Sequence, residues 1–148
     1  MDIEQLNLEP VAEAGARKLK ELFPHIDFTS GRRSLRDQAR AMSQNVTLNN
    51  SWIYQTYTGS EAAISLQDYV DHHLNQTAKH YEDAFTTILE KFSSDQLTRL
   101  SKHLGGQAFD IRPTTQDADA IKTTAHSLTG LTKFLDKEGG LVRWHLQF

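Results

Sequence analysis

The hydrophobic pattern of this chain changes its period near residue 101, and that change limits the folds available to it. Across residues 8–22 and 52–92 the apolar residues recur mostly at steps of three and four, which predicts amphipathic helices. Residues 141–148 alternate, which predicts a strand. A length of 148 residues fits one domain. We therefore predict a single α+β domain over 1–148, in which helices surround a few short strands.

Residues with strong local preferences set the expected boundaries. Pro24 is expected to end the first helix, and Ile26 and Phe28 to form a short strand. Ser34 followed by Asp37 has the pattern of a helix N-terminus, with a capping hydroxyl and an acid in the first turn. The other expected elements are a turn over 29–31, a loop over 47–51, a helical break at 59–60, a short helix from 93 and a helix over 121–135 that ends at the glycines 139–140.

The closing strand has two different faces. Val142, Trp144, Leu146 and Phe148 form the more apolar set, which we expect to face the core. The opposite set consists of Leu141, Arg143, His145 and Gln147. His145 is therefore expected on a more polar face, where a functional site could lie.

The absence of cysteine directs any metal to histidine and carboxylate ligands. His103 and Asp110 are seven positions apart, with Gly105, Gly106 and a small alanine between them, so a tight turn into a strand could bring them together. His145 could supply a third ligand. Two imidazoles and a carboxylate leave a fourth tetrahedral position for water, as in catalytic zinc sites. From spacing alone, an ordinary polar strand end is the commoner explanation.

Three segments resemble the zinc D-alanyl-D-alanine peptidase family. Residues 101–110, SKHLGGQAFD, match its S-x-H-x-x-G-x-A-x-D signature at every fixed position. Residues 29–34, TSGRRS, with Gln38 after them, resemble its S-G-Y-R-S…Q segment, and the closing WHLQF resembles its final W/P-H strand. The family includes carboxypeptidases, dipeptidases and L-alanyl-D-glutamate endopeptidases, and the hedgehog signalling domain shares its fold.

The resemblance implies a small antiparallel sheet that carries a zinc site, with helices beside it. It implies Zn²⁺ on His103, Asp110 and His145, and peptidoglycan peptides or small D-amino-acid peptides as substrates. Arg33 would contact the substrate carboxylate or carbonyl oxygen, and Ser101 and Gln38 would hold the loop or the substrate. A helical insertion at about 47–100 would enlarge the domain relative to a minimal family member.

Two positions depart from the family pattern. The general base usually stands three residues before the last histidine, where this chain has Val142, and the usual tyrosine of the S-G-Y-R segment is Arg32. Glu138 is the nearest candidate base, provided that the turn at 139–140 folds it over the metal, and Asp136 lies two residues farther upstream. Three functions therefore stay open: an active zinc peptidase, a catalytically weak zinc domain that recognises peptide or cell wall, and a helical interaction module without metal.

Charge and hydropathy narrow the expected partners and location. The net charge is −3 and no basic stripe stands out, so nucleic acid is not expected as a partner; the arginines of residues 32–40 fit a solvated helix face. The N-terminal residues lack the apolar run of a signal peptide, and no stretch reaches the roughly 18 apolar residues of a membrane span, so we expect neither element. We expect a cytoplasmic protein, or a phage protein released at lysis. His72, His73 and His80 are expected on a solvated face rather than at a second metal.

Overall fold

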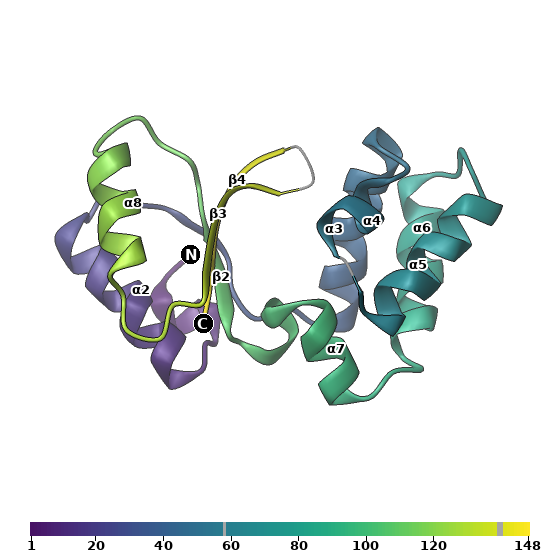
Figure 1. Cartoon of the computed structure of the whole chain (residues 1–148), viewed down its shortest axis with the longest axis horizontal. Coiled ribbons are helices and arrows are strands. Elements are labelled where there is room, and N and C mark those ends of the chain that lie inside the picture. The colour runs from purple at the N-terminus through teal and green to yellow at the C-terminus, as the bar shows by residue number, and fades with distance from the viewer. Residues whose placement is uncertain (58, 139–140) are drawn as a thin grey trace. The chain divides into compact units, whose positions relative to one another are not determined.

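Helices and one four-stranded antiparallel sheet make up the computed structural model, which describes residues 1–57, 59–138 and 141–148 without the side chains of 138 and 141. The chain forms two compact units, one from residues 1–32 and 105–148 and the other from residues 33–104 (Figure 1). The predicted α+β class is therefore confirmed at this coarse level.

The first unit is built around the sheet, whose strand order is β1-β2-β4-β3 with every neighbouring pair antiparallel. Its strands are β1 (Phe28–Ser30), β2 (Ala108–Ile111), β3 (Lys133–Glu138) and β4 (Leu141–Gln147), and its helices are α1 (Ile3–Leu6), α2 (Pro10–Leu22) and α8 (Ala118–His126). Helices α2 and α8 cover one face of the sheet (Figure 1). Phe109, Trp144 and Leu146 point to that face and are buried with Leu19 and Ile121.

The second unit is helical and has a core of its own. It contains α3 (Leu35–Leu48), α4 (Trp52–Thr56), α5 (Glu61–His72), α6 (Ala78–Leu89) and α7 (Ser94–Leu100), followed by the 3₁₀ helix η1 (Lys102–Gly105). Ser34, Ser60, Thr77 and Ser93 each cap a helix by accepting a backbone N–H, which confirms the helix starts predicted at Ser34 and Ser93. Met42, Leu66 and Phe85 are fully buried in this unit.

The strand predicted at 26–28 is displaced. Strand β1 is Phe28–Ser30, so two residues of the predicted turn belong to the sheet. The displacement follows from pairing, because Phe28 lies opposite Ile111 and Ser30 lies opposite Asp110. Ile26 is buried ahead of the strand. Cross-strand pairing of this kind decides boundaries that local preference leaves open.

The helix predicted over 121–135 is wrong beyond His126, where α8 ends. Gly130 has a φ of +82°, which turns the chain, and the backbone N–H of Thr132 then donates to the carbonyl of Gln147 at 2.8 Å. Residues 133–138 continue as β3 against β4. Sheet pairing therefore overrides the helix-like spacing of Phe134 and its neighbours. The glycines 139–140, expected to end that helix, lie outside the described residues.

Two further expectations need correction. The side chain of Val142 was expected in the core but is 62% exposed. The β3–β4 register shifts between Leu135 and Lys137, so the side chains of β4 do not alternate strictly between the two faces as far as the end of the hairpin. Helix α3 continues to Leu48, into the loop predicted over 47–51, and the helical stretch 52–92 has a second break where Asn75 adopts a φ of +60°. None of the described helices combines the length and the apolar character needed to cross a membrane.

Candidate metal centre

Cross-strand pairing aligns Asp110 and His145 on the face of the sheet opposite to α2 and α8. In β2, Phe109 and Ile111 point into the core, so Asp110 between them points to the opposite face. Asp110 lies directly opposite His145 on β4 and opposite Ser30 on β1, and directly opposed residues share a face. Ser30, Asp110 and His145 therefore form one row across three strands.

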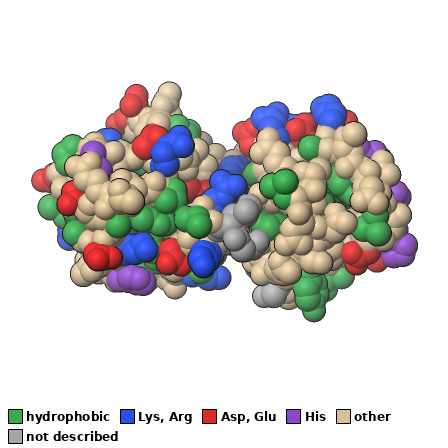
Figure 2. Space-filling model, turned by 90° about the horizontal axis from the view of Figure 1, so that it is seen from above, with side chains coloured by type: hydrophobic (Ala, Val, Ile, Leu, Met, Phe, Trp, Pro, Cys, Tyr) green, Lys and Arg blue, Asp and Glu red, His purple; other side chains and the backbone are tan. Residues whose placement is uncertain are grey.

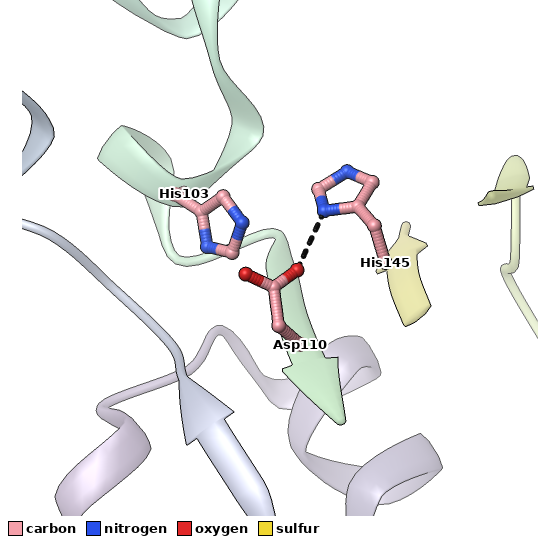
Figure 3. A group of neighbouring side chains, drawn as sticks. All are labelled: His103, Asp110 and His145. Atoms are coloured by element: carbon pink, nitrogen blue, oxygen red, sulfur yellow. Dashed lines mark hydrogen bonds and ion pairs between the residues drawn. The ribbon is translucent and has the colours of Figure 1, made fainter. Parts of the chain in front are cut away.

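His103 completes a group of three possible metal ligands. It lies on η1, and its backbone carbonyl accepts a hydrogen bond from the backbone N–H of Arg33 at 3.0 Å. One ligand atom from each of His103, Asp110 and His145 lies within 4.8 Å of the other two, and all three residues are buried. Figure 3 shows the Asp110 carboxylate between the two imidazoles. The structure thus brings together the three residues that the sequence predicted as zinc ligands.

The donor set suits a zinc ion. Ligand atoms around a tetrahedral zinc are about 3.3 Å apart, given zinc–ligand distances of about 2.0–2.1 Å. The separation of 2.9 Å between His145 Nδ1 and Asp110 Oδ1 and the limit of 4.8 Å for the whole group bracket that value. Only small side-chain movements would therefore be needed to hold the ion.

Asp110 and His145 each make a further contact through the polar atom that does not face the other residue. The hydroxyl of Ser30 donates to Oδ2 of Asp110 at 2.6 Å, and Nε2 of His145 lies 3.1 Å from Oε1 of Gln147. Hydrogen bonds of this kind fix the orientation of metal ligands. Neither Ser30 nor Gln147 has a role that the sequence predicts, although the alternation of the last strand does place Gln147 on the same face as His145.

Gly106 and Arg32 shape the turn that leads from His103 to Asp110. Gly106 has a φ of +73°, and a β-carbon at this position would lie 2.5 Å from Nη2 of Arg32. The Arg32 guanidinium donates to the carbonyl of Asn7 at 2.9 Å and to the carboxylate of Glu9 at 2.7 Å. The backbone N–H of Glu9 in turn donates to the Gly106 carbonyl at 2.9 Å. Arg32 therefore packs against this turn.

The three predicted substrate-binding residues belong to the helical unit. Nη1 of Arg33 donates to Oε1 of Gln38 at 3.3 Å, and the fully buried Gln38 donates through Nε2 to the hydroxyl of Tyr57 at 3.2 Å. Ser101 is buried at the end of α7, where its carbonyl accepts from the backbone N–H of Leu104 at 3.1 Å. Gln38 thus holds the Arg33 guanidinium, and Ser101 holds the start of η1.

The acids near the hairpin differ in their surroundings. Oδ2 of Asp136 lies 3.6 Å from Nζ of Lys122, which also lies over the Trp144 ring, so Asp136 is engaged toward the core side of the sheet. Glu138 ends β3 opposite Leu141, and its side chain lies outside the described part of the structure. Leu141 precedes His145 by four strand residues, roughly 13 Å. The role of Glu138 as the general base therefore stays a prediction.

The exposed histidines of the helical unit form an aromatic stack. Tyr69 stacks on His73 with ring centroids 4.0 Å apart, and its hydroxyl lies 2.6 Å from Nε2 of His80. His72 is exposed and lies 3.5 Å from Asp68. Among the described residues, His103, Asp110 and His145 form a group of three neighbouring side chains that could hold a metal ion, and none of these exposed histidines belongs to such a group.

Comparison of the chain with protein-family models, with curated protein sequences and with solved structures gave no match. The structure itself therefore supplies a buried His–Asp–His group that can hold a metal ion, on an α+β scaffold.

Proposed function

We propose that this chain is a zinc-dependent peptidase that hydrolyses peptide bonds in bacterial cell-wall peptides, of the D-Ala-D-Ala or L-Ala-D-Glu type. The proposal includes a fold of the D-alanyl-D-alanine peptidase and hedgehog type. The observation that carries it is the buried group of His103, Asp110 and His145, with one ligand atom from each within 4.8 Å of the others. Their two imidazoles and one carboxylate are the donor set of catalytic zinc sites.

In this proposal His103, Asp110 and His145 hold the zinc ion, and the ring nitrogens must be unprotonated where they bind it. When bound, zinc lowers the pKa of a coordinated water to about 7 and polarises a carbonyl oxygen. Ser30 keeps the Asp110 carboxylate oriented through its 2.6 Å hydrogen bond.

Arg33 is the proposed substrate-binding residue. A guanidinium matches the planar shape of a carboxylate and can donate two parallel hydrogen bonds to it. Gln38 restrains Arg33 by accepting one of its N–H groups at 3.3 Å. Because Gln38 is fully buried, the position of that restraint is fixed by the helical core.

Hydrolysis also needs a group that takes a proton from water and gives it to the departing amine, while the water oxygen joins the carbonyl carbon. Val142 cannot do this, and Asp136 is engaged with Lys122. We assign the role to Glu138. Its carboxylate would accept a proton from the water as the water oxygen attacks the carbonyl carbon, and would return it to the amine nitrogen as the C–N bond breaks.

The test is digestion of purified peptidoglycan by the zinc-loaded protein, with new fragments identified by mass spectrometry. His145→Ala is expected to abolish the fragments, and Glu138→Gln to reduce their formation at least a hundredfold, the scale of general acid–base catalysis. His72→Ala, which removes an exposed histidine outside the metal group, should leave digestion unchanged. The fragment masses identify the bond that is cut.

A zinc-binding domain without catalysis is the second candidate, and the exposed Val142 at the usual position of the general base favours it. Zinc binding without any new fragments would support this candidate and contradict the peptidase proposal. Such a domain would sediment with peptidoglycan in a pull-down while leaving it intact.

A further inference from the structure

We infer that Gln147 is a positioning residue for the metal centre, which holds the His145 ring so that Nδ1 is its ligand atom. The inference rests on the zinc site of the proposed function and adds a residue to it. Its basis is the pair of contacts that His145 makes at opposite sides of its ring, 2.9 Å from Nδ1 to Asp110 Oδ1 and 3.1 Å from Nε2 to Gln147 Oε1.

The two contacts distinguish the ring nitrogens. Nδ1 faces Asp110, which belongs to the metal-ligand group, whereas Nε2 faces an amide oxygen. A nitrogen that binds a metal has no proton, so the single proton of a neutral imidazole must be on the other nitrogen. Nε2–H then donates to Oε1 of Gln147, which selects this tautomer and fixes the rotation of the ring.

The strand geometry keeps Gln147 in register with His145. The two residues are separated by one position on β4, so their side chains lie on the same face. Gln147 pairs with Ala108 on one side and with Lys133 on the other, so its backbone is fixed by both neighbouring strands. His145 is only 6% exposed, so little water competes for its Nε2.

The experiment measures the zinc affinity of the full chain by competition with a chromophoric chelator. Gln147→Leu removes the acceptor, and Gln147→Asn shortens the side chain so that the acceptor falls short of Nε2. Both variants should raise the Kd for zinc 10- to 100-fold, the usual effect of losing such a partner. Gln147→Glu keeps an oxygen at the same reach and should stay within about threefold of the unmodified protein.

A second measurement separates positioning from a general effect on folding. In the Co²⁺-loaded protein, Gln147→Leu and Gln147→Asn should alter the visible absorption of the metal while circular dichroism stays unchanged. Arg143→Leu, at an exposed position two residues before His145, is the matched control and should change neither zinc affinity nor the Co²⁺ spectrum.

The inference is overturned if Gln147→Leu and Gln147→Asn bind zinc as tightly as the unmodified protein, or if Gln147→Glu loses as much affinity as they do. An unmodified protein that binds no zinc would overturn both this inference and the proposed function. Zinc affinity that depends on Gln147, in a protein that cuts no peptidoglycan, would reject the peptidase and leave the inference standing.

Discussion

At the residue scale, Gly106 is a position where adding a single methyl group should have a measurable effect on stability. Its φ of +73° disfavours any side chain, and the Arg32 guanidinium occupies the space that a β-carbon would need. Gly106→Ala must move Arg32 away from Asn7 and Glu9, and should lower the free energy of unfolding by about 2–3 kcal/mol. Urea denaturation of the metal-free protein measures this loss.

Gly59 provides the matched control for that substitution. It has a similar φ of +79°, but nothing lies within 4 Å of the place where its β-carbon would be. Gly59→Ala should therefore lower the free energy of unfolding only by the backbone strain of a positive φ, about 1 kcal/mol. Equal losses at the two glycines would show that the Arg32 contact contributes nothing to stability.

The candidate metal ligands could be predicted from the sequence because the motif that contains two of them is local. Residues 101–110 contain both His103 and Asp110, and the small residues between them permit the turn that brings the two together. Ser30 could not be assigned in the same way. Its contact with Asp110 joins positions 80 apart, and it depends on a β1–β2 register that no local pattern specifies.

At the scale of elements, helices α3 and α6 are joined by an ionic cluster around Glu82. The side chain of Glu82 is only 10% exposed and lies 3.0 Å from both Arg36 and Arg40. Hydrogen bonding to Arg36 is the main cause that lowers the pKa of Glu82 below its usual 4.5. A lowered pKa means that ionised Glu82 stabilises the folded state above pH 4.5, and that this contribution disappears as the pH falls through the folded-state pKa.

Glu82→Gln should therefore lower the melting temperature at pH 7 by several degrees, because it leaves two arginines without their shared carboxylate. The difference from the unmodified protein should shrink as the pH falls through the lowered folded-state pKa of Glu82, where the carboxylate itself becomes protonated. Thermal unfolding at pH 7, 5 and 3 checks this. Glu90→Gln, at an exposed acid, is the control; a Glu82 effect that does not vary with pH would contradict the ionic explanation.

The elements differ in how far their sequences determine them. Helix starts were predictable because Ser34 and Ser93 cap through bonds to residues three positions away, which lie within any local window. Strand β3 was not predictable. Leu131, Phe134 and Leu135 have the spacing of a helix face, and they adopt their actual structure after the turn at Gly130 through pairing with β4.

At the scale of the whole molecule, zinc should stabilise the folded state, because the three ligands are together only after folding. At a free zinc concentration 100 times the Kd, zinc is expected to raise the free energy of unfolding by about 2.7 kcal/mol. Asp110→Asn should abolish this zinc-dependent increase in stability, and His72→Ala should leave it unchanged. Thermal unfolding with and without a chelator measures the effect, and identical melting curves would favour a helical interaction module without metal.

The helical unit should also fold without the rest of the chain. It is continuous in sequence over residues 33–104 and has its own buried core, which includes Met42, Leu66 and Phe85. The excised fragment should have a helical circular dichroism spectrum and a cooperative melt, although its small size makes it marginal. Phe85→Ala, which removes a fully buried ring, should abolish cooperative melting. A fragment that is unfolded at 10 °C would show that the unit depends on the remaining chain.

The hydrogen bond between the backbone N–H of Arg33 and the carbonyl of His103 has a consequence for the order of folding. It joins residues 70 positions apart, 33 and 103, and so ties the two ends of the helical unit together. If the segment were unstructured, closing a loop of that length to pair β1 with β2 would cost about 4 kcal/mol in chain entropy. If the helices of residues 33–104 fold first, they bring the two ends of this segment together, so the entropy of closing the loop is no longer lost when the sheet forms. A destabilised helical core should therefore slow the assembly of the metal centre, even when every ligand is intact.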